Sequence, residues 1–414
     1  AVATAPRQGP VYLDLPGEVL GGISDEDVPV GPAASAHAAT PPTEAQVDAI
    51  LDALAASSRP LIVSGSGIIW AGASAAMEQF VDLTGVPFFT TPQGRGVISE
   101  DHELALLGAR TLAFRKAAFV LSLVTRSNFI IGHLKPPRWA GDVTVAMVNL
   151  DGDELAKTRP AIAVQHDARL VLEALNARLL QRPADRARLD PWIDHLRQKD
   201  ATASAKMVAM ANNQAHPIHP LRLMAEIAKV LDKDSIVIED GHDTLGFCRH
   251  SLKSHRPGHR INPGTMGNVG LGVPFGIGAK AARPASTVFV VSGDSAFGWN
   301  GIEIDTACRH NLPIICVIVN NGGITAKPQD PANEMPGQDL GTPDYHLVAK
   351  AFGGHGERVE RADDIAPALQ RALASGLPAI LNVIVDPYVA SATHLGFAGV
   401  MSSSYGEGKK GEIQ

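Results

Sequence analysis

Apolar residues recur along most of the chain in two alternating patterns. Stretches with apolar residues three or four positions apart predict helices, and short continuous apolar runs between them predict buried strands. The first series of predicted elements comprises a helix at 44–57, strands at 60–63, 86–90, 118–123 and 143–149, and a helix at 168–181. This alternation is typical of parallel sheets that are covered by helices on both faces.

A second alternating series begins near residue 217. Its predicted elements are helices at 218–231, 270–282 and 299–310, and strands at 235–239, 287–292, 313–319 and 379–385. Between the two series, residues 183–215 are charged and predict a helical connector. We therefore expect an α/β protein with two parallel-sheet sandwich domains, the first of them a Rossmann-like central domain.

The two ends of the chain depart from this pattern. Residues 11–15 predict one short strand, which is not stable without neighbouring strands. Residues 17–42 are rich in Pro, Gly, Ala and Ser and predict a linker. The expected organisation is the end of a preceding domain with its linker at 1–42, domains at 43–185 and 186–386, and a Ser-, Gly- and Lys-rich tail at 387–414.

Composition narrows the functional class. With 414 residues, 45% hydrophobic and 19% charged, the chain can bury sizeable cores and is not a disordered tail. Its net charge of −7 argues against a nucleic-acid partner, and no apolar run approaches the ~20 residues of a membrane-spanning helix. The 3 cysteines lack a paired-ligand spacing, so we expect no disulfide framework or structural zinc site, and a cytoplasmic location.

The strand ends of the second series carry the strongest chemical signal. Gly293-Asp294-Ser295-Ala296-Phe297-Gly298 follows one strand, and Asn320-Asn321-Gly322-Gly323 follows the next. Open α/β sheets bind ligands at the carboxyl ends of their parallel strands. Carboxylate and amide oxygens suit Mg²⁺, and the glycines allow backbone to approach a diphosphate. The simpler alternative is that Asp294 caps a helix and that the second motif is an ordinary turn.

The spacing of these motifs resembles that of a known family. Gly-Asp-Ser, with 27 residues from Asp294 to Asn321 in Asn-Asn-Gly, resembles the diphosphate-binding motif of thiamine diphosphate enzymes. The longer motif, with Asn311-Leu312-Pro313 before the second strand, resembles the branch that contains oxalyl-CoA decarboxylase and 2-hydroxyacyl-CoA lyase. In that family Asp294, Asn321 and the Gly323 carbonyl would hold Mg²⁺.

The resemblance covers nearly the whole chain and bears on how the chain begins. Residues 12–16 resemble the phrase that closes the family's N-terminal pyrimidine-binding domain. The resemblance therefore implies that this domain, with the glutamate that activates the cofactor, is absent from the present sequence. It also implies a homodimer or homotetramer, because the active sites of the family lie between subunits.

The resemblance further implies a set of cofactor contacts. Residues 240–244 follow the strand at 235–239 and would hold the diphosphate, although His242 could equally be a solvated loop residue. Val269 takes the position of the apolar wedge that bends the cofactor, where relatives often have Met or Leu; the alternative is a core residue. The implied cofactor-binding residues are Gly241, His242, Asp243, Thr244, Val269, Gly293, Ser295, Ala296, Ile324 and Thr325.

A coenzyme A ester and, in some family members, ADP are also implied ligands. Arg249 begins a basic run, residues 249–256, that would capture coenzyme A phosphates if it is not simply a solvated loop. Arg95 matches a coenzyme A contact of the family. The implied nucleotide contacts of the central domain are Arg110, Asp151 and Asp167. Each of these four could instead be a surface charge.

The implied reaction cleaves a 2-hydroxyacyl-CoA to formyl-CoA and an aldehyde or ketone by way of the thiamine ylide. Thr325 stands where the decarboxylase branch usually has Tyr, which together with Val269 favours a roomier site for a branched substrate such as 2-hydroxyisobutyryl-CoA. Candidate catalytic residues are Glu334, in the loop after the metal motif, and Tyr405, in a tail that could close as a lid; a solvated acid and an unstructured tail are the alternatives. Two other functions stay open: an oxalyl-CoA decarboxylase, and a non-catalytic nucleotide-binding subunit.

Overall fold

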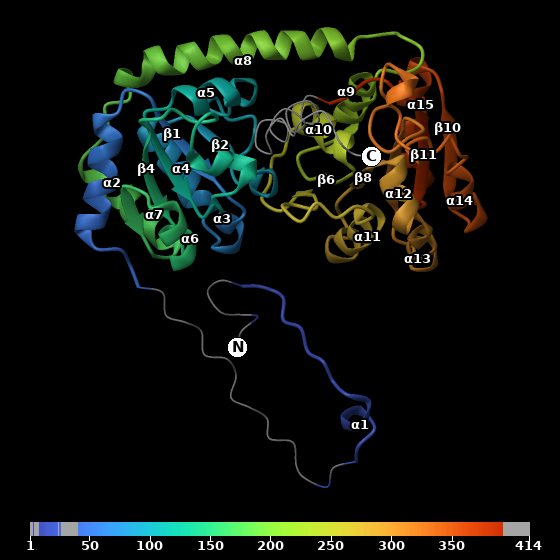
Figure 1. The fold of residues 1–414 in the computed structure, drawn as a ribbon, viewed down its shortest axis with the longest axis horizontal. Helices are drawn as coiled ribbons and strands as arrows, with labels where there is room; N and C mark the ends of the chain where they lie inside the picture. Colours follow the sequence, from blue (N-terminus) through green and yellow to red (C-terminus); the bar gives the residue numbers. More distant parts are fainter. Residues whose placement is uncertain (1–2, 4–7, 24, 26–39, 392–414) are drawn as a thin grey trace, which may run out of the picture.

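The first sheet of the protein is fully parallel. In the computed structural model, which describes residues 3, 8–23, 25 and 40–391, its strand order is β2-β1-β3-β4-β5 (Figure 1). The strands are β1 (Pro60–Ser64), β2 (Phe88–Thr90), β3 (Phe119–Leu123), β4 (Thr144–Val148) and β5 (Ile162–Val164). Every neighbouring pair runs in the same direction, as the alternating helix and strand pattern predicted.

Helices cover both faces of this first sheet. They are α2 (Glu44–Ala56), α3 (Gly67–Trp70), α4 (Ser74–Thr84), α5 (Arg110–Lys116), α6 (Gly152–Thr158) and α7 (Ala168–Gln181). Side chains of α2, α4 and α7, among them Ile50, Phe80 and Leu172, fill the core on one face. Phe114 of α5 stacks on Trp139 in the core on the other face, with ring centroids 4.2 Å apart.

The second sheet is also fully parallel. Its strands, in the order β10-β11-β9-β8-β6-β7, are β6 (Ile236–Asp240), β7 (Arg260–Ile261), β8 (Val288–Gly293), β9 (Ile314–Asn320), β10 (His355–Val359) and β11 (Ala379–Ile384). Because β6, β8 and β9 are direct neighbours, their carboxyl ends lie together at one edge. The expected fold class, two parallel-sheet α/β sandwiches, is confirmed.

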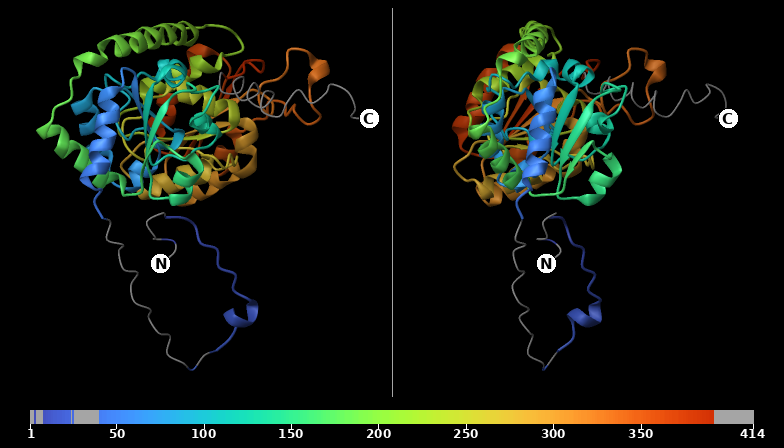
Figure 2. Two further views of the ribbon diagram at one scale, coloured as in Figure 1. Left: turned by 60° about the vertical axis from the view of Figure 1, so that its left-hand side comes forward. Right: turned by 90° about the vertical axis from the view of Figure 1, so that its left-hand side faces the viewer.

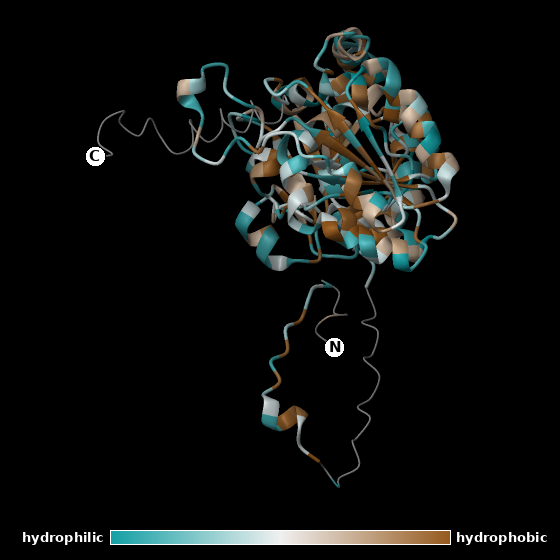
Figure 3. Ribbon diagram, turned by 90° about the vertical axis from the view of Figure 1, so that its right-hand side faces the viewer, coloured by the Kyte–Doolittle hydropathy of each residue, from teal (hydrophilic) through white to brown (hydrophobic). Residues whose placement is uncertain are grey.

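The second sheet is likewise covered on both faces. Its helices are α9 (Pro220–Val230), α10 (His242–Ser251), α11 (Gly272–Ala282), α12 (Asp294–Asn300), α13 (Ile304–Arg309), α14 (His346–Ala351) and α15 (Ala362–Ser375). Residues of α9, α10 and α15 form the core on one face, and residues of α11, α12 and α13 contribute to the core on the other. Hydrophobic residues are concentrated on the strands and the inner helix faces (Figure 3).

The connector between the sheets forms one long helix. Helix α8 (Asp190–Ala211) runs along one side of both units (Figures 1 and 2). Its Asp200 accepts a hydrogen bond of 2.7 Å from the Gly108 amide, so α8 is fixed to the loop before α5. No helix in the described part of the chain is long and apolar enough to span a membrane.

The structure corrects several predicted elements. The strand expected at 11–15 is wrong: these residues are exposed and pair with no strand among the described residues, and helix α1 (Gly17–Leu20) follows them within the predicted linker. The helix predicted at 299–310 starts earlier, because α12 begins at Asp294 and a 3-10 turn at Gly301–Glu303 separates it from α13. The alternative that the basic run at 249–256 is a solvated loop is wrong for Arg249, since that residue lies in α10.

Candidate functional site

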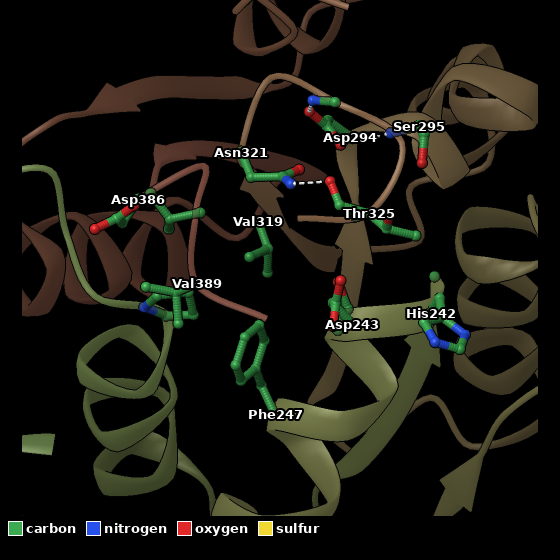
Figure 4. Close-up of a pocket in the computed structure, with 16 residues that line it drawn as sticks. His242, Asp243, Phe247, Asp294, Ser295, Val319, Asn321, Thr325, Asp386 and Val389 are labelled. Atoms are coloured by element: carbon green, nitrogen blue, oxygen red, sulfur yellow. Dashed lines mark hydrogen bonds between the residues drawn. The ribbon is translucent and has the colours of Figure 1, made fainter. Parts of the chain in front are cut away.

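The carboxyl ends of β6, β8 and β9 surround one pocket (Figure 4). Ten of the residues predicted to bind the cofactor or metal line it: Gly241, His242, Asp243, Thr244, Gly293, Asp294, Ser295, Asn321, Gly323 and Thr325. The prediction that three separate strand ends meet at one site therefore agrees with the geometry. The sequence did not indicate the residues that complete the lining, which are Pro220, Phe247, Val319, Val385, Asp386 and Val389. Apolar residues in a strand or helix give no sequence signal that separates pocket from core.

Asp294 is the buried acid of this pocket. It is 1% exposed, and its carboxylate accepts hydrogen bonds from the amides of Ser295 (2.8 Å) and Gly323 (3.1 Å). Burial raises the pKa of Asp294 to about 6, because a charged carboxylate is poorly solvated there, although the backbone amides act in the opposite direction. A cation next to this group would favour its ionised form.

Oxygen donors for a cation converge around Asp294. The amide nitrogen of Asn321 donates to the Thr325 carbonyl at 2.6 Å, which directs the nitrogen away and leaves the Asn321 oxygen as an acceptor. The Gly323 amide binds Asp294, so the turn after β9 lies directly against the acid. Among the described residues, no group of three or more His, Cys, Asp or Glu side chains could hold a metal. One carboxylate with amide and carbonyl oxygens fits Mg²⁺ rather than a transition metal.

Gly241 and Thr244 shape the pocket from the β6 side. Gly241 has φ 97°, and a Cβ atom there would lie 3.2 Å from the Gly293 nitrogen. Helix α10 begins at the next residue, so its first amides and the buried Thr244 face the strand ends. Backbone amides at a helix start that approach closely without side chains are typical of a phosphate site.

Asp243, besides lining the pocket, binds the backbone of two loops. One carboxylate oxygen accepts a hydrogen bond from the Ala326 amide at 3.0 Å, and the other accepts one from the Ser391 amide at 2.8 Å. The first loop follows β9 and the second follows β11. The side chain thus joins α10 to both neighbouring chain segments.

Several predicted site residues lie outside the pocket lining. Val269 and Ile324 are 42% and 48% exposed, and Ala296 is buried in α12. Glu334 is exposed in the loop with the short 3-10 helix Pro331–Asn333, which projects from the body of the protein (Figures 2 and 3). Tyr405, and with it the predicted lid, lies outside the described residues.

Three arginines from the two units influence one another. Arg110 starts α5 and lies over the Phe114 ring, 4.4 Å from its centroid. Burial and the charges of Arg249 and Arg138 lower the pKa of Arg110 to about 9. In the described part of the chain no acid forms a salt bridge with Arg110 or Arg249, and Glu239, which attracts Arg249, is itself paired with Arg260. Among the described residues, the positive charge of this cluster is therefore only partly offset, by Glu239 near Arg249.

The remaining predicted ligand contacts have structural partners. Arg95 is 5% exposed and forms a bidentate ion pair with Glu100, with Nε–Oε1 and Nη2–Oε2 distances of 2.7 and 2.5 Å. Asp151 and Asp167 cap the N-termini of α6 and α7 through backbone amides. The surface-charge alternative is thus wrong for Arg95. The carboxylates of Asp151 and Asp167 stabilise the N-termini of α6 and α7.

The fold and the pocket define the class of the protein: an α/β protein with a polar pocket at the carboxyl edge of a parallel sheet, where such folds bind ligands. Comparison with known families specifies it further. Residues 47–175 match the central domain of thiamine pyrophosphate enzymes, and residues 241–383 match their C-terminal thiamine pyrophosphate-binding domain. The chain belongs to the thiamine pyrophosphate enzyme family and is a thiamine diphosphate-dependent enzyme, as the motifs predicted.

Individual relatives have different names within this family. A 2-hydroxyacyl-CoA lyase of Oryza sativa is 30% identical, with 94% of this chain and 72% of the relative covered. An oxalyl-CoA decarboxylase of Escherichia coli is 29% identical, with 93% and 70% covered. An acetolactate synthase large subunit of Mycobacterium tuberculosis is 31% identical, with 94% and 71% covered. Similarity in sequence alone therefore does not separate three reactions.

Proposed function

We propose that the protein is a carbon–carbon lyase that cleaves a 2-hydroxyacyl-CoA to formyl-CoA and an aldehyde or ketone, with thiamine diphosphate and Mg²⁺. The cluster of Arg110, Arg138 and Arg249, which α10 connects to the cofactor pocket, supports this proposal, because its positive charge would attract the phosphates of a coenzyme A ester. The relatives include a 2-hydroxyacyl-CoA lyase and an oxalyl-CoA decarboxylase, whose names specify CoA substrates.

Helix α10 separates Arg249 from the pocket by a distance that suits the length of a coenzyme A ester. His242 and Asp243 at its start line the pocket, and Arg249 follows seven residues after His242, about 10 Å along the axis. A coenzyme A ester carries its reacting carbonyl at the end of a long arm, well separated from its phosphates. Arg249 and Arg110 would bind the phosphates while the carbonyl reaches the pocket. Planar guanidinium groups suit phosphate oxygens.

The chain's own residues would hold and orient the cofactor. Asp294, Asn321 and the Gly323 carbonyl would coordinate Mg²⁺, and the amides at the start of α10 with Thr244 would bind the diphosphate. Thiamine diphosphate supplies an electron sink for cleavage of the bond beside the thioester carbonyl. The small Thr325 lines the pocket and would leave room for a branched acyl group such as 2-hydroxyisobutyryl, whereas Val269 lies outside the lining and gives this preference no support. A catalytic role for Glu334, nucleotide contacts by Asp151 and Asp167, and ADP binding stay predictions.

The deciding experiment incubates the complete gene product with thiamine diphosphate, Mg²⁺ and either 2-hydroxyisobutyryl-CoA or oxalyl-CoA. We expect formyl-CoA and acetone from the first substrate. Formyl-CoA and carbon dioxide from oxalyl-CoA alone would instead identify a decarboxylase. Absence of metal-dependent thiamine diphosphate binding, measured by calorimetry, would support the non-catalytic alternative.

A substitution in the arginine cluster distinguishes binding of the CoA ester from binding of the cofactor. Replacing Arg249 with Gln should raise KM for the CoA ester on the order of 10-fold, because one charge-assisted contact is lost. The affinity for thiamine diphosphate should stay unchanged. An unchanged KM would remove the support that this cluster gives to a CoA substrate.

A further inference from the structure

Asp243 lies where three chain segments meet beside the pocket. It belongs to the first turn of α10 (Figure 4), and its two carboxylate oxygens accept hydrogen bonds from different loops. One loop is the turn after β9 that contains Gly323 and Thr325. The other is the segment after β11 that contains Asp386 and Val389 and ends, among the described residues, at Ser391.

The two loops are adjacent as well as separately bound. The Lys327 amide donates to the Pro387 carbonyl at 2.7 Å, next to the bond between Ala326 and Asp243. Ser391 is 1% exposed, so its amide, which donates to the carboxylate, is removed from water. Neither loop is part of a helix or a strand ladder at these positions.

We infer that Asp243 is a positioning residue that couples the turn after β9 to the segment after β11, so that the two loops open or close together. One carboxylate serving two amides makes each bond depend on the same side chain. Loss of this side chain frees both amides at once, whereas two independent anchors would release one loop at a time. The effect on the cofactor rests on the proposed function, because the turn after β9 also carries the proposed metal ligand Gly323.

The coupling is tested by hydrogen exchange on the protein without cofactor. In Asp243→Ala, we expect the amides of both Ala326 and Ser391 to exchange about tenfold faster or more. In Asp243→Asn, the single amide oxygen can serve only one of them, so one of the two sites should lose protection. Faster exchange at Ala326 with unchanged exchange at Ser391 in Asp243→Ala would overturn the inference.

Asp339 provides a matched control in the same loop. It accepts from Lys327 at 2.8 Å and from the Gly341 amide at 3.0 Å, and its side chain is exposed. Asp339→Ala should speed exchange at Gly341 and leave Ser391 unchanged, because this acid does not contact the segment after β11. Equally fast exchange at the Ser391 amide in both variants would mean that any destabilisation of the loop after β9 also reaches the segment after β11. That result would refute a specific role for Asp243.

The functional consequence is measured separately. The folded Asp243→Asn protein, with its fold checked by its melting curve, should bind thiamine diphosphate and Mg²⁺ about tenfold more weakly. A purely structural role would lower the Tm and leave the Kd unchanged. If Asp294→Asn also leaves the Kd unchanged, the proposed cofactor site has failed rather than the coupling, which the exchange experiment tests alone.

Discussion

Gly241 shows how one residue sets the dimensions of the pocket. It joins β6 to α10 with φ 97° and ψ 151°, a combination that essentially only glycine adopts. At the same position the backbone of Gly293 approaches so closely that a Cβ would lie 3.2 Å from its nitrogen. Conformation and space therefore both require glycine where strand end and helix start meet.

Replacing Gly241 with Ala should destabilise the protein by about 1–3 kcal/mol, because the backbone conformation is strained for any other residue. Urea unfolding measures the change. Gly298→Ala is the control, since Gly298 lies within α12 with nothing within 4 Å of the added methyl group, and helix propensity favours Ala there. A Gly241 variant as stable as the Gly298 variant would contradict the argument.

Asp294 is the residue on which metal binding should depend. Asp294→Asn keeps the shape and one hydrogen-bond acceptor but removes the negative charge that a cation would neutralise. We expect Mg²⁺-dependent thiamine diphosphate affinity to fall on the order of 100-fold, measured by calorimetry. Asp305→Asn, in an exposed pair with Arg309, should bind as the native protein does. Native affinity in the Asp294 variant would rule out this residue as the ligand.

At the scale of elements, the sequence predicted those helices and strands whose bounds depend on the local pattern of apolar and capping residues. Helix α7 was predicted at 168–181 and begins and ends there, because an apolar face and the cap Asp167 act locally. The three-residue strand β5 gave no such pattern. Helix α10 was missed because the Gly- and Asp-containing motif at 240–244 is typical of turns, whereas in the structure it starts a helix. The site was predicted better, since its residues follow long apolar strands.

Asp240 connects two elements that sequence could not pair. Its carboxylate accepts hydrogen bonds from the amides of Gly270 (3.0 Å) and Gly272 (2.8 Å), so it attaches the start of α11 to β6. Burial raises the pKa of this carboxyl. The segment that contains Val269 is thereby fixed to the carboxyl end of β6.

Removing this attachment has a predictable effect. Asp240→Ala should destabilise the protein by about 2–4 kcal/mol and speed hydrogen exchange at Gly270 and Gly272, because two buried amides lose their acceptor. Asp240→Asn should retain most of the stability, since one amide oxygen can replace the oxygen that accepts both bonds. If the two variants were equally destabilised, charge rather than hydrogen bonding would be the cause.

At the scale of the whole molecule, buried charges join the two units. Arg95 and Glu100, from the first unit, bind the Leu252 carbonyl (2.7 Å) and the Ser254 amide (2.9 Å) of the second. The pair Glu239 and Arg260 lies buried in the second unit. The family resemblance implied that Arg95 contacts coenzyme A, and nothing local in the sequence distinguishes a charge buried at an interface from one exposed in a loop.

The ion pair of Arg95 and Glu100 makes the joint between the units sensitive to acid. Burial alone would raise the pKa of Glu100, but the Arg95 charge and hydrogen bonds from Arg95 and Ser254 outweigh it and hold the pKa below the usual 4.5. A lowered folded-state pKa stabilises the protein above pH 4.5, and this stabilisation is lost as pH falls through the folded value.

Replacing Glu100 with Gln should therefore lower the free energy of unfolding by about 3–5 kcal/mol at pH 7, because Arg95 stays buried without its partner. The difference from the native protein should shrink below pH 4.5. Urea unfolding at several pH values measures both effects, and Asp305→Asn, in its exposed pair, should change stability by less than about 1 kcal/mol. A difference that persisted undiminished at low pH would show that Glu100 contributes through shape and not through its charge.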